Sequence, residues 1–205
     1  ALWRSALCAL TRCAALTGRS PSDFPLAGLS QADVDALERA GAVDDVLPLL
    51  PLQQGMYFHA VFGDGVDTYR VQQIATLSGG VDPAVLERSI HTVIRRHPAL
   101  RAGFAELEDG RIAQVIWSDA RSEFRVVESP DVETIAREEL SRPFDLRQAP
   151  LVRYTLVSRG SDDHRLIQTL HHIVADGWSY PVIFGDIVAV YNAAVTGEPG
   201  PPPVG

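Results

Sequence analysis

Apolar and polar residues along the chain follow two periods, one typical of amphipathic helices and one typical of half-buried strands. An apolar residue recurs every three or four positions over residues 2–16, which predicts a helix at the start. The same spacing, with capping and breaking residues at its ends, predicts further helices at residues 30–38, 52–62, 82–97, 130–142 and 181–195. Strand-like segments are predicted at residues 68–77, 100–107, 111–117, 123–128, 150–158 and 163–172.

Because strands and helices are interspersed, the pattern predicts an α/β or α+β fold in which a mixed sheet is packed with helices. A cluster of helix-breaking residues at 20–25 is typical of a linker, so residues 1–42 are interpreted as an upstream linker or helical segment. Residues 43–197 are expected to form the globular unit. The proline-rich residues 198–205 are expected to be a tail or a cut end.

Composition narrows the possible functions. The 205 residues are 46% hydrophobic with a net charge of −8, so a nucleic-acid partner, which would need a basic face, is not expected. No apolar run predicts a membrane span and no signal peptide opens the chain. All 18 basic residues are arginine, which excludes a Schiff-base lysine. Two cysteines, Cys8 and Cys13, predict no disulfide framework, and the expected location is the cytoplasm.

The densest chemistry lies at residues 170–179, where a predicted strand gives way to a helix. His171 and His172 are adjacent, and adjacent strand residues point to opposite faces. One imidazole is therefore expected to be buried and the other to reach an accessible cleft. Asp176 and Gly177 follow, which predicts a tight loop held by a carboxylate, with Gly177 allowing a positive φ or a close backbone approach.

Three interpretations of this segment stay open on the residues alone. In the first, His172 is the base or orienting group of an acyl transfer, and Asp176 is a buried structural carboxylate that needs a cationic partner. In the second, His171, His172 and Asp176 bind a metal ion, although no recognised ligand spacing supports it. In the third, a core histidine lies beside a helix cap. A serine-hydrolase elbow is disfavoured because residues 177–181 lack its closing glycine.

Residues 171–177 read His-His-Ile-Val-Ala-Asp-Gly, which resembles the HHxxxDG motif of the condensation domains of nonribosomal peptide synthetases. Other segments resemble further motifs of the same family, in the same order along the chain. They are Leu49–His59, Arg96–Phe104, and Arg142–Leu146 with Pro150–Arg153. The resemblance covers about residues 43–196.

The resemblance implies a fold similar to chloramphenicol acetyltransferase. This chain, which starts without Met, would be the N-terminal lobe, and the missing C-terminal lobe would complete a substrate tunnel. Within the motif of His171 and His172, the resemblance makes His172 the catalytic histidine and Asp176 the residue that holds the loop. Arg101 is the expected ion-pair partner of Asp176. The backbone N–H of Gly177 is expected near the developing oxyanion.

The implied reaction is aminolysis of a thioester, with His172 as base, orienting group or both. The substrates would be carried on phosphopantetheine arms of donor and acceptor peptidyl carrier proteins, and no cofactor or metal is expected in the chain itself. Trp178 and Ser179 are expected at the substrate channel, with core packing as the alternative for Trp178.

The order of Trp178 and Ser179 resembles condensation domains that accept a D-configured donor. Residues 21–33 resemble the junction after an epimerisation domain, so an epimerisation domain upstream and an adenylation domain downstream are the expected neighbours. The isolated chain is expected to be inactive. Two alternatives stay open: a non-catalytic carrier-binding or interface module of the same fold, and a hydrolase that uses the same histidine.

Overall fold

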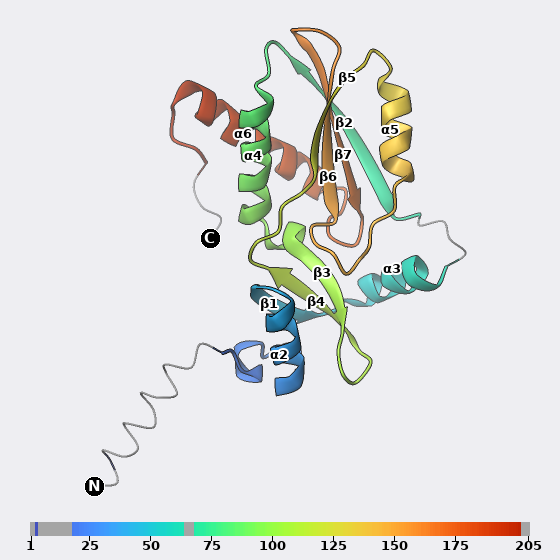
Figure 1. The fold of residues 1–205 in the computed structure, drawn as a ribbon, viewed down its shortest axis with the longest axis vertical. Helices are drawn as coiled ribbons and strands as arrows, with labels where there is room; N and C mark the ends of the chain where they lie inside the picture. The colour runs from blue at the N-terminus through green and yellow to red at the C-terminus, as the bar shows by residue number, and fades with distance from the viewer. Residues whose placement is uncertain (1–2, 4–17, 64–67, 202–205) are drawn as a thin grey trace.

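A computed structural model describes residue 3, residues 18–63 and residues 68–201, so most of the helix predicted at residues 2–16 lies outside the described residues. Figure 1 shows the chain as an elongated body with two sheets. In chain order the elements are the 3₁₀ helix η1 (Pro21–Asp23), α2 (Gln31–Ala40), β1 (Val43–Pro48), α3 (Pro51–Phe62), β2 (Arg70–Ser78), α4 (Pro83–Arg96), the 3₁₀ helix η2 (Pro98–Arg101), β3 (Ala102–Glu106), β4 (Ile112–Trp117), β5 (Phe124–Glu128), α5 (Val132–Ser141), β6 (Val152–Ser158), β7 (Asp163–His171) and α6 (Ser179–Thr196).

The larger sheet has four strands in the order β2-β7-β6-β5. Its β2–β7 and β6–β7 pairs are antiparallel and its β5–β6 pair is parallel, because α5 provides the crossover that a parallel pair needs. The smaller sheet is antiparallel, with the order β1-β4-β3. The predicted fold class, a mixed sheet packed with helices, is confirmed.

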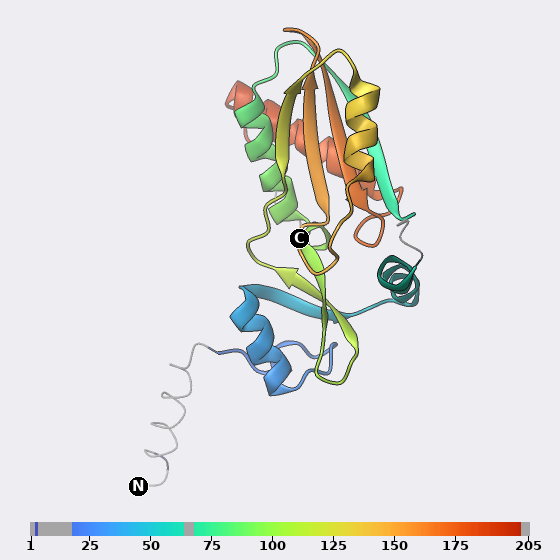
Figure 2. The same ribbon diagram turned by 45° about the vertical axis from the view of Figure 1, so that its right-hand side comes forward.

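Helices cover both faces of the larger sheet, with α4 and α6 on one side and α5 on the other (Figure 2). Along β7 the side chains alternate between these faces. Leu166 and Leu170 pack with α4 and α6, whereas Ile167 packs with Ala136 of α5. The strand is therefore buried on both faces, and every side chain from Leu166 to His171 is buried, the polar Gln168 and Thr169 included.

Helix α4 shows how closely local sequence sets the elements. The Asp82 carboxylate accepts hydrogen bonds from the N–H groups of Ala84 and Val85 at 2.9 and 3.1 Å, so it caps the helix. Pro98 follows the last turn, where it cannot continue the helix. The apolar face of the helix is buried against the sheet and α6: Leu86, Ile90, Val93 and Ile94.

The smaller sheet is packed against the N-terminal part of the described chain. Ser30 and Asp33 form a reciprocal capping box at the start of α2, which places Val34 and Leu37 against β1 and β4. Phe24 is only 2% exposed and joins the same cluster, so the segment expected to be a linker contributes to a core. The domain boundary near residue 43 stays a prediction.

A third apolar cluster lies where the two sheets meet. It includes Met56 and Tyr57 from α3, Phe104 from β3, and Ile173 and Val174 from the segment after β7. Since fully buried apolar side chains resist displacement, this cluster holds the segment after β7 at a fixed position between the two sheets.

Candidate active site

Strand β7 delivers the two adjacent histidines to different environments. His171 is its last residue and is 0% exposed, and its Nδ1 accepts a hydrogen bond from the N–H of Ile173 at 3.1 Å. His172 lies one residue beyond the strand and is half-buried. Its own N–H donates to the carbonyl oxygen of Tyr69 at 2.8 Å. The separation of the two imidazoles is the one that strand alternation predicts.

The ring of His172 has a defined proton position. Its Nδ1 lies 2.6 Å from the carbonyl oxygen of Ala175. Because a carbonyl oxygen only accepts, the hydrogen of the neutral ring is on Nδ1 and the lone pair is on Nε2. No hydrogen bond joins Nε2 to the part of the chain that the structure describes. The arrangement suits a group that accepts a proton or a hydrogen bond through Nε2.

A residue on α3, not predicted from the sequence as part of the site, helps to hold this loop. The side-chain nitrogen of Gln53 donates to the carbonyl oxygen of Ile173 at 3.2 Å and to Oε1 of Gln114 at 2.7 Å. Its side-chain oxygen accepts from the N–H of Leu50 at 3.0 Å, at the start of the helix. The available signal was a polar side chain at the third position of a proline-initiated helix, where it reaches back to cap the N-terminus.

Asp176 is not the buried carboxylate that was expected. It is exposed, and its Oδ1 accepts from the N–H groups of Trp178 and Ser179 at 3.1 and 3.0 Å and from the Ser179 hydroxyl at 2.8 Å. The Ser179 hydroxyl, followed by the backbone N–H groups, holds the pKa of this carboxyl below its usual range. Asp176 therefore does hold the loop, but through bonds within the loop itself.

The predicted ion pair between Arg101 and Asp176 is wrong in this structure. Arg101 is 7% exposed, and its Nη1 bonds the carboxylate of Asp44 and the carbonyl oxygen of Trp117, the latter at 2.6 Å. The reason is sheet order, because β4 lies between β3 and β1 and so brings Asp44 to the end of η2. The Ser118 hydroxyl donates to the same carboxylate, and together with Arg101 it holds the pKa of Asp44 below its usual range.

Gly177 differs from expectation in its backbone. Its φ is not among the positive values, so of the two alternatives, a positive φ and a close backbone approach, the first does not hold. A side chain built there would meet no atom within 4 Å in the described part of the chain. The residue is exposed, so the N–H of Gly177 next to an oxyanion stays a prediction.

A small hollow of about 260 Å³ lies between η2, the loop and the first turns of α6. Trp178 and Ser179 line it together with Asp176 and His97. Trp178 is 87% exposed, so the alternative that it packs in the core does not hold in this chain. Both predicted channel residues therefore line one hollow, but His172 is not among its lining residues. A substrate channel here stays a prediction.

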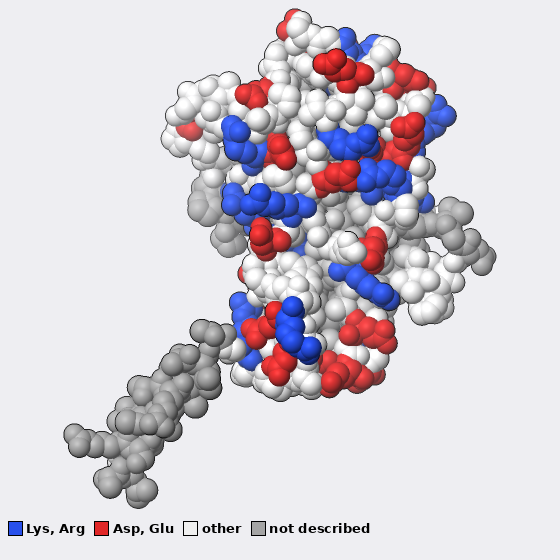
Figure 3. Space-filling view, in the orientation of Figure 1, with Lys and Arg blue, Asp and Glu red and all other residues white. Residues whose placement is uncertain are grey.

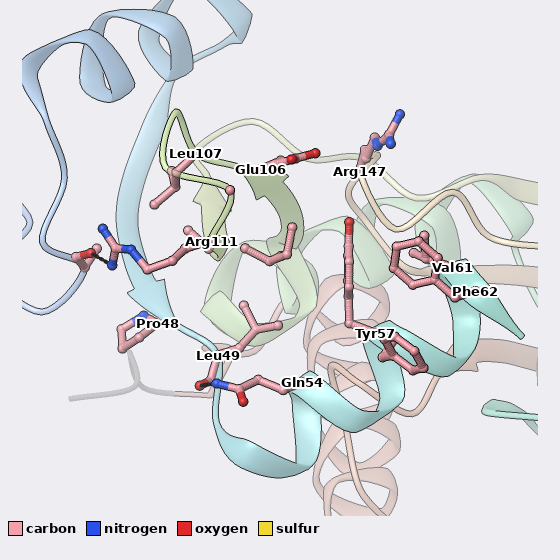
Figure 4. Close-up of a pocket in the computed structure, with 15 residues that line it drawn as sticks. Pro48, Leu49, Gln54, Tyr57, Val61, Phe62, Glu106, Leu107, Arg111 and Arg147 are labelled. Atoms are coloured by element: carbon pink, nitrogen blue, oxygen red, sulfur yellow. Dashed lines mark hydrogen bonds between the residues drawn. The ribbon is translucent and has the colours of Figure 1, made fainter.

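A larger hollow of about 560 Å³ opens between α3 and the hairpin of β3 and β4. Figure 4 shows Tyr57 and Phe62 of α3 on one side of it and Leu107 and Arg111 of the hairpin on the other. None of the sequence-predicted site residues lines this hollow. The hollow therefore brings no further functional group to the segment of residues 171–179.

Neither a metal nor a membrane is indicated by the described residues. Within residues 18–63 and 68–201 there is no group of three His, Cys, Asp or Glu side chains placed to hold an ion. His171 is buried in the fold while Asp176 is bonded to Ser179 at the surface, so the three-ligand interpretation has no geometric support. The helices of the same part of the chain include none that is long and apolar enough to cross a bilayer.

The fold is shared with solved condensation domains. A double mutant of the starter condensation domain of the rhizomide synthetase RzmA superposes with a TM-score of 0.72 at 22% identity, covering 78% of this chain and 40% of that chain. The first condensation domain of the calcium-dependent antibiotic synthetase, solved with a substrate analogue, gives a TM-score of 0.68 at 20% identity, covering 76% of this chain and 39% of that chain. These likenesses define the class, a chloramphenicol acetyltransferase-like α/β fold.

Sequence comparison then identifies the family. The family model of the condensation domain matches residues 43–204, so the chain belongs to the condensation-domain family. Vanchrobactin synthetase VabF of Vibrio anguillarum is 31% identical over 192 residues, which is 87% of this chain and 7% of that protein. Bacitracin synthase 1 of Bacillus licheniformis is 28% identical over 191 residues, 87% of this chain and 4% of that protein. The predicted family is confirmed. The chain spans only a small part of these relatives.

Proposed function

We propose that this chain is part of a condensation domain that forms an amide bond between a donor acyl thioester and an acceptor amine. The observation that carries the proposal is the state of His172. Its ring is half-buried at the end of β7, Nδ1–H is committed to the carbonyl oxygen of Ala175, and Nε2 keeps a lone pair. Family membership supplies the reaction class.

In the proposed reaction the acceptor amine attacks the carbonyl carbon of the thioester. A C–N bond forms, the C–S bond breaks, and one proton passes from the nitrogen to the departing thiolate. Nε2 of His172 accepts a hydrogen bond from the amine, or its proton, and returns the proton to sulfur. Since an α-amino group has a pKa of about 7.7–8.0, much of it is already unprotonated at neutral pH, so orientation contributes alongside proton transfer.

The substrates would reach the loop on phosphopantetheine arms of a donor and an acceptor carrier protein. Trp178 followed by Ser179 supports a D-configured donor, as the sequence resemblance implies. Because the chain covers about 40% of the solved domains it matches, the rest of the domain is needed to complete a channel, and the 205-residue chain alone should give no turnover.

The test uses the complete domain that contains this chain, with donor and acceptor carrier proteins loaded with thioesters. His172→Ala should lower amide formation by about 10²–10⁴-fold, the usual contribution of a positioned acid–base group. Arg137→Ala serves as the control, because that side chain is exposed on α5 and lies outside the family motifs, and it should leave the rate unchanged. Unfolding curves of both variants show whether a loss of rate is a loss of fold. Equal rates for wild type and His172→Ala would refute the proposal, and release of free acid in place of amide would favour the hydrolase.

A second candidate is a non-catalytic interaction module. One solved structure with this fold is described as the complex of the X-domain and OxyB from teicoplanin biosynthesis, at 28% identity, a TM-score of 0.68, and coverage of 76% of this chain and 35% of that chain. A domain of this fold can therefore bind another protein. A complete domain that retains a protein partner but makes neither amide nor acid would support this second function.

A further inference from the structure

A third hollow, with charged walls, lies between α4 and the segment that follows β4. It shares no lining residue with the hollow beside Asp176. Its volume is about 260 Å³. One wall is a single face of α4, with Arg88, His91 and Arg95 at helical spacing, and the opposite wall carries Asp119 and Arg121. The hollow is smaller than the usual ligand pocket of about 300–1,000 Å³, so it suits a small polar group.

The walls are strongly basic, although the chain as a whole carries a net charge of −8. Arg88 and Arg95 are exposed, and neither forms an ion pair within the part of the chain that the structure describes. Asp119 is the one carboxylate among the lining residues, and it lies 3.7 Å from Arg121, with both side chains about four-fifths exposed. An exposed pair at that distance neutralises little charge. Figure 3 shows basic side chains over α4, with acidic side chains between them.

His91 lines the same hollow from α4. Its Nδ1 is buried and has no hydrogen-bond partner among the described residues, while Nε2 lies 3.7 Å from Glu87. Because Nδ1 is buried, an anion in the hollow would be held by the guanidinium groups and not by His91.

We propose that this hollow binds a phosphate group. Three guanidinium groups on two facing walls can supply paired donors to several oxygens of one doubly charged anion, which a carboxylate with two oxygens and one charge would use less fully. Because every basic residue of the chain is arginine, the argument rests on the number and placement of the charges and not on the choice of arginine over lysine. The site does not depend on amide formation at His172.

The experiment measures binding of inorganic phosphate and of pantetheine 4′-phosphate to the whole chain by amide NMR titration, at ionic strength held constant with chloride. Saturable shifts confined to residues 88–95 and 119–121 are expected, with a dissociation constant of about 1 mM or lower. Equal affinities would indicate free phosphate as the ligand, and tighter binding of the ester would indicate the carrier arm. Both results support phosphate binding.

Three variants test whether phosphate binds in this hollow. Arg95→Gln should weaken phosphate binding about threefold to tenfold, the effect of losing one charge-assisted contact at a surface site. Arg121→Gln, from the opposite wall, should do the same, so a misfolded α4 variant does not decide the outcome. Arg137→Gln is the control, since this exposed arginine on α5 lies outside the hollow, and it should leave the affinity unchanged.

The proposal is overturned by any of three results. One is the absence of saturable shifts with inorganic phosphate. Another is an unchanged dissociation constant in both Arg95→Gln and Arg121→Gln. The last is equal or tighter binding of glutamate, which would make the hollow a general anion surface. None of these results bears on amide formation, so this proposal and the proposed function fail separately.

Discussion

Asp176 and Glu139 are carboxylates at the ends of helices, and their negative charges are stabilised in opposite ways. Asp176 is exposed beside the first turn of α6, and its partners lie two and three residues along the chain. Glu139 is 2% exposed near the end of α5, and its partners come from three different segments. The first site is held by local hydrogen bonds, and the second is held by tertiary ion pairs.

The charges around Glu139 form a compact network. Its carboxylate lies 2.5 Å from Arg125, 2.9 Å from Arg142 and 3.3 Å from Arg153. Arg142 also bonds Glu123 at 2.6 Å, which holds the pKa of that carboxyl below its usual range. Arg153 is 6% exposed, and burial lowers the pKa of its guanidinium. The whole network ties α5 to β5 and β6.

Asp176 was expected to be the buried carboxylate that needs a cationic partner, but Glu139 is the residue in that position. The rule that a buried carboxylate needs a cation is sound, but in this chain it applies to Glu139. Asp176 needs no cation because water and three local donors satisfy it. Loss of Glu139 should therefore damage the fold far more than loss of Asp176.

The largest effect is expected for Glu139→Ala. Removing this carboxylate leaves the buried Arg153 without its counter-charge, so the free energy of unfolding should fall by about 3–5 kcal/mol. Urea denaturation of the chain measures the change. Glu138→Ala is the matched control on the exposed face of α5 and should alter stability by less than about 0.5 kcal/mol. Similar values for the two variants would show that the network adds no stability.

Gln53→Ala should have the next largest effect, because it removes the bond from α3 to the carbonyl oxygen of Ile173. A loss of about 0.5–1.5 kcal/mol in the free energy of unfolding is expected. Gln54→Ala is the control, since Gln54 makes only a long bond of 3.3 Å to Leu49 within its own helix start. If Gln54→Ala costs as much as Gln53→Ala, the loop does not depend on α3.

A double-mutant cycle tests which acid pairs with Arg101. Arg101→Met combined with Asp44→Asn should show a coupling energy of about 0.5–1 kcal/mol, modest because the Asp44 side chain is 43% exposed. Arg101→Met combined with Asp176→Asn should be additive. Coupling to Asp176 and not to Asp44 would restore the pair expected from the sequence.

The smallest effect is expected for Asp176→Asn, and it should depend on pH. The folded-state pKa of Asp176 is lowered, so its charge stabilises the fold above the unfolded-state pKa of about 3.9. As pH falls through the lowered folded-state pKa, that stabilisation is lost. The stability difference between wild type and Asp176→Asn should be complete above about pH 5 and vanish in strong acid, as denaturation at several pH values would measure. A difference independent of pH would mean that the charge plays no part.

Much of the fold could be predicted from local signals. Asp82 and Pro98 delimit α4 because capping and helix breaking act over a few residues. The different environments of His171 and His172 follow from strand alternation. Strand β1 was not among the predicted strands, since Asp44 and Asp45 interrupt its apolar pattern and it pairs with β4, nearly seventy residues further along the chain.

Local sequence was enough to predict most of the elements, the family motif and the partial exposure of one imidazole at the end of β7, because each depends on residues within about four positions of one another. The order of the strands was needed to bring Arg101 to Asp44, Glu139 to Arg125 and Arg153, and Gln53 to Ile173. Those contacts join segments that meet only after the strands have taken their order in the sheets. A carboxylate's own neighbours in sequence do not reveal whether it will be exposed to water or enclosed with cations.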